Sequence, residues 1–172
     1  MTDFTLTKHD DGVAIITWDC PGKSMNVLSF TGLDELSACV DLVLSDDDIK
    51  GAVITSGKAG SFAGGMDLNV LASLKENAGD NPAQSVFDGI MHMHGVLRKI
   101  ERAGMDPKTL KGGKPIATAL PGTAMGIGLE IPLASHRSFV ADNPKAKIGL
   151  PEIMVGLFPA LAAQPALFVN WA

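Results

Sequence analysis

Two glutamates stand in surroundings that are unusual for a charged side chain. Glu130 lies in "GLEIPL" and Glu152 in "GLPEIM", so apolar residues and prolines flank both, whereas glutamates are rarely buried without a partner. If the two carboxyl groups lie together, apolar surroundings and mutual repulsion raise at least one pKa, as acid–base chemistry near neutral pH requires. Taken singly, each has an equally good structural explanation: Glu130 as a charge at a helix N-terminus and Glu152 as a loop residue.

Two glycine-rich stretches each follow an apolar run and precede a helical pattern. They are "AVITSGKAGSFAGGMDL" (52–68) and "IATALPGTAMGIGLE" (116–130). A helix N-terminus presents free N–H groups, and two such ends that face each other would form a donor pair for an oxyanion. The alternative is that the glycines only serve tight turns. Lys58 precedes most of its glycines, and neither stretch has GxGxxG followed by a suitably placed acidic residue, which argues against Walker and Rossmann sites.

The elements that would position these residues alternate between strand and helix. β-branched residues predict strands over 12–18, 51–56 and 115–120, and "RSFVAD" predicts another over 137–142. Apolar spacing predicts a helix over 31–45, with Thr31 and Asp34 as a capping pair, and a longer helix that includes Val86 to Ile100. A short helix should follow 116–126 and kink or end early at Pro132. This order indicates an α/β fold, and the length of 172 residues fits one domain.

Composition excludes several classes of function. The net charge of −5 and the lack of a basic stripe argue against nucleic acid and against an anionic membrane surface as partners. No apolar run is long enough for a membrane span. The two cysteines, Cys20 and Cys39, form no disulfide framework, and the polar N-terminus is no signal peptide, so we expect a cytoplasmic protein with reduced, packed cysteines.

Four motifs in order make the sequence resemble the enoyl-CoA hydratase/isomerase (crotonase) family. More narrowly, it is similar to the N-terminal hydratase part of the multifunctional fatty-acid oxidation enzymes that also carry a 3-hydroxyacyl-CoA dehydrogenase domain. The resemblance covers about residues 10 to 159. It rests on "PGKSMNVL" (21–28), "SGKAGSFAGGMDL" (56–68), "GKPIATALPGTAMGIGLE" (113–130) and "AKIGLPEIMVGLFP" (146–159).

The resemblance implies a crotonase-like spiral of ββα repeats that binds an acyl-CoA thioester. Two backbone N–H groups would hold the thioester carbonyl, and in this chain they belong to Met66 and Ile127. Most family members have smaller residues at these two positions, so pocket width can differ although the N–H groups remain. CoA would lie along the backbone near Ser24, Met25 and residues Ala63, Gly64 and Gly65. CoA is part of the substrate, and no separate cofactor is expected.

The family chemistry explains why two carboxylates are needed. Hydration of a 2-enoyl thioester places a hydroxyl on C3 and a hydrogen on C2, so one group accepts a proton from water and another delivers one. Glu130 and Glu152 stand at the two family positions, which favours hydration in fatty-acid β-oxidation. Two alternatives stay open: an enoyl-CoA isomerase, which would depend less on one glutamate, and a non-catalytic fragment that binds acyl-CoA.

Other residues with reactive side chains give weaker signals. His92 and His94 are two apart on a predicted helix and therefore point to different faces, so we expect no metal site. Asp67 is better placed to cap a helix than to react. The methionines Met91, Met93 and Met125 should pack in the core or in the acyl pocket.

The last thirteen residues depart from the family pattern. After Pro159 the family usually continues close to GAGGTTRL, whereas this chain has "ALAAQPALFVNWA". Codons exist for 160–172 that translate as GAGGTTRLVRKLG once a single additional G precedes them. We therefore interpret 1–159 as the crotonase-like core and 160–172 as a frameshifted tail, which sequencing of the coding DNA would test.

This interpretation changes what the chain itself is expected to do. In the family, later helices close the acyl pocket and make trimer contacts, and we expect this chain to lack these helices. The resemblance thus implies a homo-oligomer of the trimer type whose contacts this chain does not supply. We expect the chain to keep its CoA-binding core and both glutamates but to show weak or no hydratase activity.

Overall fold

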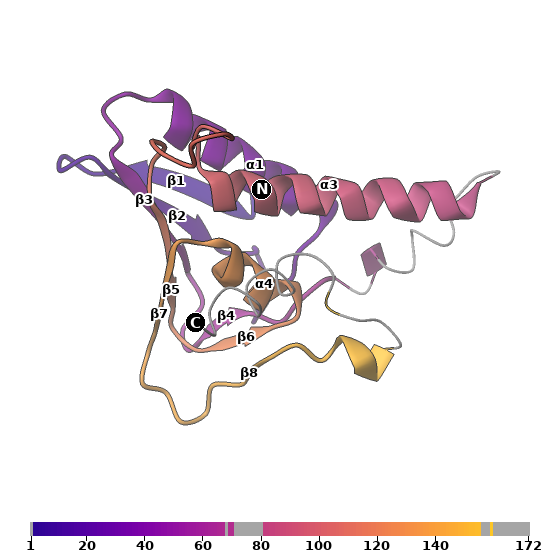
Figure 1. Cartoon of the computed structure of the whole chain (residues 1–172). Coiled ribbons are helices and arrows are strands. Elements are labelled where there is room, and N and C mark those ends of the chain that lie inside the picture. The colour runs from indigo at the N-terminus through magenta and orange to yellow at the C-terminus, as the bar shows by residue number, and fades with distance from the viewer. Residues whose placement is uncertain (1, 68, 71–80, 156–158, 160–172) are drawn as a thin grey trace.

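Strands of two sheets alternate along the chain, and helices connect them (Figure 1). The computed structural model describes residues 2–67, 69–70, 81–155 and 159. The elements in order are β1 Phe4–Lys8, β2 Val13–Trp18, α1 Phe30–Ser45, β3 Gly51–Ser56, β4 Ser61–Ala63, α3 Pro82–Arg102, β5 Ile116–Leu120, β6 Thr123–Met125, α4 Ile127–Ala134, β7 Arg137–Val140, β8 Ile148–Gly149 and the 3₁₀ helix η1 Glu152–Val155.

The larger sheet has the strand order β1-β2-β3-β5-β7, and the smaller sheet has the order β4-β6-β8. Among the strands that the structure describes, β1 and β2 run antiparallel and all other pairs are parallel. Each of β3, β5 and β7 is followed along the chain by a strand of the smaller sheet and then by a helix. The expected ββα repeat and α/β class are therefore confirmed.

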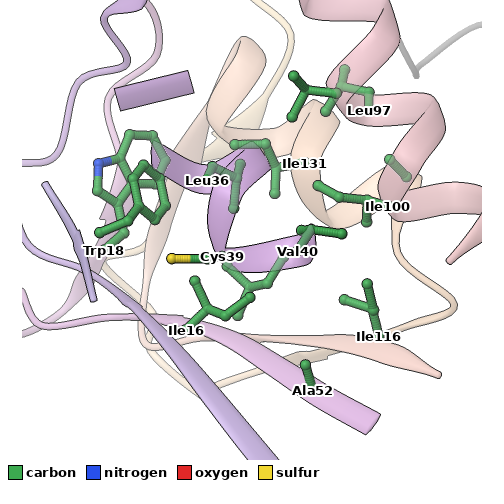
Figure 2. Close-up of a cluster of buried hydrophobic side chains, with 14 of the residues drawn as sticks. Ile16, Trp18, Leu36, Cys39, Val40, Ala52, Leu97, Ile100, Ile116 and Ile131 are labelled. Carbon is green, nitrogen blue, oxygen red and sulfur yellow. The ribbon is translucent and has the colours of Figure 1, made fainter. Parts of the chain in front are cut away.

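The core lies between the larger sheet and the helices that cover it (Figure 2). Burial alternates along β2, so Ala14, Ile16 and Trp18 are fully buried while the residues between them are only half-buried. This period of two is what a strand with one covered face requires. Leu36 and Val40 of α1 pack on these residues, together with side chains from α3, β5 and α4. Both cysteines are free and buried in this core.

Two local predictions about the helices are corrected. α1 begins earlier than its predicted capping pair, because the Ser29 hydroxyl accepts the Gly32 N–H at 3.0 Å; Thr31 and Asp34 lie inside the helix. α4 does not end before Pro132 but runs two residues beyond it. Pro132 lies near the end of this eight-residue helix. Its missing N–H removes only one backbone hydrogen bond there, so the helix tolerates the proline.

The polar N-terminus contains a strand that was not predicted. β1 pairs with β2 in the register Phe4↔Trp18, and the two rings stack with centroids 5.0 Å apart. Phe4 is buried, whereas most of the other β1 side chains are exposed. An edge strand with one buried side chain gives little periodicity for sequence analysis to detect. Within the described residues, no helix combines the length and apolar character needed to cross a bilayer.

Burial predicts a sharp contrast between two leucines of α1. Leu36 is fully buried, and its replacement by alanine should reduce the free energy of unfolding by about 2–5 kcal/mol, because the core keeps a cavity. Leu42 is 56 % exposed, and Leu42→Ala should change it by about 0.5 kcal/mol or less. Chemical denaturation of both variants measures this contrast. Equal losses would contradict the placement of α1 on the sheet.

Candidate active site

The first glycine-rich turn places the Met66 amide beside a short parallel pairing. The Leu28 N–H donates to Gly65 O, and the Asp67 N–H donates to Leu28 O, both at 2.9 Å. Leu28 and Met66 are thus partners in an isolated parallel bridge. Because the bonds of this bridge use the residues on either side of Met66, its own N–H points away from Leu28. The amide proposed for carbonyl binding is therefore not consumed by this pairing.

The second turn places the N-terminus of α4. Gly126 precedes the helix with a positive φ of 55°, and its N–H donates to Gly149 O of β8 at 3.0 Å. Its own carbonyl accepts the N–H groups of Leu129 and Glu130. Ile127 is the first helical residue, a position whose N–H has no acceptor within a helix. A glycine N-cap also offers no side chain to bond it.

The two turns touch through glycines. A Cβ on Gly65 would lie 3.3 Å from Met125 O, and one on Gly126 would lie 3.9 Å from the Gly65 Cα. A Cβ on Gly128 would lie only 2.6 Å from the Ala63 Cβ, closer than two such carbons approach. The start of α4 therefore lies directly on the end of β4. This contact brings the neighbours of both glycines, Met66 and Ile127, to the same place.

Both glutamates lie at this contact. Glu130 is in the first turn of α4 and is 3 % exposed, and Glu152 is the first residue of η1. Glu152 Oε1 is 3.1 Å from the position that a Gly126 Cβ would occupy. Glu152 Oε2 is buried and has no hydrogen-bond partner among the described residues. A carboxyl oxygen of this kind is positioned to bond a water or a substrate atom.

The surroundings of Glu152 raise the pKa of its carboxyl group. Burial raises the pKa of its carboxyl group above the ordinary value, and the nearby charge of Glu130 raises it further, against a hydrogen bond from the backbone of residue 152. Loss of hydration disfavours the charged carboxylate, and a second negative charge adds repulsion. The sequence prediction that the two carboxyl groups converge therefore agrees with this geometry. Their catalytic roles stay a prediction.

The segments predicted to bind CoA also lie together. Ser24 and Met25 are exposed, Ala63 is buried, and a Cβ on Gly64 would lie 2.5 Å from Met25 Sδ. The Gly64 N–H donates to Asn26 O at 2.8 Å. The 24–26 loop thus runs against the end of β4. Binding of CoA at this place stays a prediction.

Asn26 is a residue that the sequence analysis did not single out. Its side chain is fully buried and makes hydrogen bonds to the Cys20 N–H, the Trp18 and Phe62 carbonyls and the Ser56 hydroxyl. One signal was available: an asparagine inside the apolar run "MNVL". A single buried polar residue does not reveal its partners, because the bonds to Ser56 and Phe62 span 30 and 36 residues.

Two ion pairs hold the loop formed by residues 19–23. Lys23 pairs with Asp67 at 2.7 Å, and this pairing lowers the pKa of the Asp67 carboxyl group. Asp67 Oδ1 also accepts the Asn69 N–H at 3.0 Å, the capping contact predicted for it. Lys58 donates to Cys20 O at 2.7 Å and pairs with Asp19. Charged contacts therefore connect residues 19–23 to Lys58 and Asp67 of the first glycine-rich stretch.

The remaining candidates lie apart from this contact. His92 bonds Asp34 of α1 at 2.7 Å, and among the described residues no group of three or more His, Cys, Asp or Glu side chains could hold a metal ion. Met93 is buried as predicted, but Met91 is half exposed, because α3 buries a narrower stripe than its sequence suggests. A cavity of about 610 Å³ opens at the charged β1–β2 turn, lined by Lys8, Asp48 and Lys50 among others, and contains neither glutamate.

Comparisons with known proteins agree with this geometry. The family model for enoyl-CoA hydratase/isomerase matches residues 13–167. The chain belongs to the enoyl-CoA hydratase/isomerase family. A curated relative, the fatty acid oxidation complex subunit alpha of Idiomarina loihiensis, is 37 % identical over 161 residues, which cover 91 % of this chain and 20 % of that protein. This chain therefore spans about a fifth of the length of the curated relatives it matches.

Solved structures share the fold. An enoyl-CoA hydratase from Shewanella pealeana superposes with a TM-score of 0.78 at 18 % identity, covering 96 % of this chain and 55 % of that one. A protein from Geobacillus kaustophilus that is described as the same enzyme superposes with a TM-score of 0.74 at 28 % identity. The match covers 91 % of this chain and 52 % of that one. Residues 160–172, interpreted above as a frameshifted tail, lie outside the described residues, so that interpretation stays a prediction.

The raised pKa of Glu152 predicts a pH-dependent gain in stability on its removal. A carboxyl group with a raised pKa in the folded state contributes stability that is complete below its ordinary pKa of about 4.3 and is lost as pH rises through the raised value. Glu152→Gln stays neutral throughout. Its Tm should equal that of the parent at acid pH and exceed it at neutral pH.

Thermal unfolding between acid and neutral pH, at fixed ionic strength, checks this behaviour. Glu101→Gln is the matched control, because Glu101 is an exposed partner of Arg98 on α3. The control should not gain stability as pH rises. A Glu152→Gln variant that is less stable than the parent at neutral pH would show that the folded state prefers the charged carboxylate.

Proposed function

We propose that this site hydrates 2-enoyl-CoA thioesters, with Glu130 and Glu152 as the acid–base pair and the N–H groups of Met66 and Ile127 as the donors for the thioester oxygen. The observation that carries the proposal is the position of Glu152. Its carboxyl group lies against Gly126, beside the Glu130 charge and next to the residue that begins α4. Two carboxyl groups and two available amides are the parts that water addition needs.

The raised pKa suggests how the roles divide. A water molecule would attack C3 while Glu130 takes its proton, and the electron pair of the double bond would move onto the thioester oxygen as an enolate. The two amides would stabilise this negative charge because they are fixed before it develops. Glu152, whose carboxyl group has a raised pKa, would deliver a proton to C2. One proton is accepted and one is delivered, so the reaction balances without a further cofactor.

The substrate class follows from the family and from the relatives. Curated relatives are named as alpha subunits of the fatty acid oxidation complex, which supports a fatty acyl-CoA substrate and a role in β-oxidation. The proposal also includes a homo-oligomer and a cytoplasmic location. Cys20 and Cys39 are free and buried, and burial raises both thiol pKa values.

Separate substitution of the two glutamates tests the proposal. Hydration of crotonyl-CoA is followed by the loss of ultraviolet absorbance of the conjugated thioester, in this chain and in a version with one G restored after the Pro159 codon. Glu130→Gln and Glu152→Gln should each lower kcat by about 10²–10⁴-fold, because each removes one proton transfer. Glu101→Gln, the same change on an exposed face of α3, should leave the rate unchanged.

The other outcomes distinguish the competing functions. If the chain shifts a double bond and only one of the two glutamates is needed, it is an isomerase. If calorimetry detects binding of a CoA thioester without turnover in either version, it is a non-catalytic acyl-CoA-binding domain. Full hydratase activity in Glu152→Gln would contradict the assigned chemistry.

A further inference from the structure

The side chain of Asn26 uses its hydrogen-bonding capacity fully inside the core. Its Oδ1 accepts the Cys20 N–H at 2.9 Å. Its Nδ2 lies 2.9 Å from Trp18 O, 3.0 Å from Ser56 Oγ and 2.9 Å from Phe62 O. An amide nitrogen has two hydrogens, so three acceptors saturate it. Because the residue is fully buried, no solvent could replace a partner that is lost.

These bonds join elements that are far apart in the sequence. Trp18 ends β2, Ser56 ends β3, and Phe62 lies in β4, the strand that leads to the first glycine-rich turn. One side chain therefore fixes the ends of two strands of the larger sheet to a strand of the smaller sheet. The Trp18–Phe62 ring contact, at 5.9 Å between centroids, packs beside it.

The backbone of Asn26 continues this connection toward Met66. Asn26 O accepts the Gly64 N–H at 2.8 Å, so Asn26 is bonded to the β4 segment at both residue 62 and residue 64. Two residues further along both segments, Leu28 and Met66 form their bridge. The direction of the Met66 N–H therefore depends on how residues 62–64 are held.

We infer that Asn26 is a positioning residue, which aims the Met66 N–H at the substrate carbonyl without touching the substrate. This inference rests on the proposed function. Donors in an oxyanion site are each worth about 10²–10³ in rate, and a displacement of about 1 Å can cost a factor of about 10². No residue of similar size replaces asparagine here: leucine would leave the Cys20 N–H without its acceptor and the Phe62 carbonyl without its Asn26 donor, and aspartate would face the Trp18 and Phe62 carbonyl oxygens with a negative charge.

The test uses Asn26→Asp, because pH controls whether the carboxyl group of this variant is ionised. With the carboxylate ionised, the bonds to Trp18 O and Phe62 O are lost; once it is protonated, its O–H restores one donor. In the ¹⁵N-labelled chain, the Met66 amide resonance should move at alkaline pH and return toward the parent position on acidification, while the Ile127 resonance changes little. The kcat for crotonyl-CoA relative to the parent should fall about 10²-fold and recover over the same pH range.

Asn81→Asp is the matched control. Asn81 caps α3 at its exposed end, and aspartate caps as well, so neither readout should change. If Asn26→Asp does not fold, Asn26→Ser keeps a single hydroxyl and should move the Met66 resonance in the same sense. A folded variant whose Met66 amide is unmoved overturns the inference, as does a displaced amide with an unchanged kcat. If both this chain and the version with the additional G lack hydratase activity, the proposed function fails, and the Met66 resonance then decides alone whether Asn26 positions this amide.

Discussion

The backbone contact between the two glycine-rich turns is the constraint on which the site depends. Any side chain at Gly128 would collide with Ala63, and Gly65 and Gly126 both adopt positive φ angles where their backbones approach. Such close packing brings the end of β4 and the start of α4 together. With them come the N–H groups of Met66 and Ile127, which the Leu28–Met66 bridge and the α4 helix do not use. The strands of the smaller sheet, β4, β6 and β8, are only two or three residues long.

The same contact places the Glu152 carboxyl group beside the Glu130 charge. Glu130 occupies the first turn of α4, where the helix dipole favours a negative charge. Glu152 Oε2 has no hydrogen-bond partner among the described residues, and burial together with the Glu130 charge raises the pKa of this carboxyl group. A buried polar atom without a partner reduces stability, and proteins commonly accept this loss where chemistry requires it.

Sequence analysis predicted the parts of the fold that have a clear period. β2, β3, β5, α1 and α3 carry enough apolar residues for their spacing to show, and each was located to within a few residues. The strands β4, β6 and β8 are too short to have a measurable period, and β1 buries one hydrophobic residue only. The proximity of Glu130 to Glu152 came from the motif resemblance, because composition and spacing contain no information about tertiary contacts. Asn26 was missed for the same reason: its partners Ser56 and Phe62 are distant in sequence.

The central claim is that the Met66 and Ile127 amides bind a thioester carbonyl, and it can be measured without turnover. A chain labelled with ¹⁵N at methionine and isoleucine is titrated with butyryl-CoA, which has the carbonyl but no double bond to hydrate, and in parallel with free CoA, which has no carbonyl. A new hydrogen bond shifts an amide proton downfield. We predict downfield shifts of both the Met66 and the Ile127 amide protons with butyryl-CoA and not with CoA. Equal shifts with both ligands, or a shift at neither residue when butyryl-CoA is bound, would contradict it.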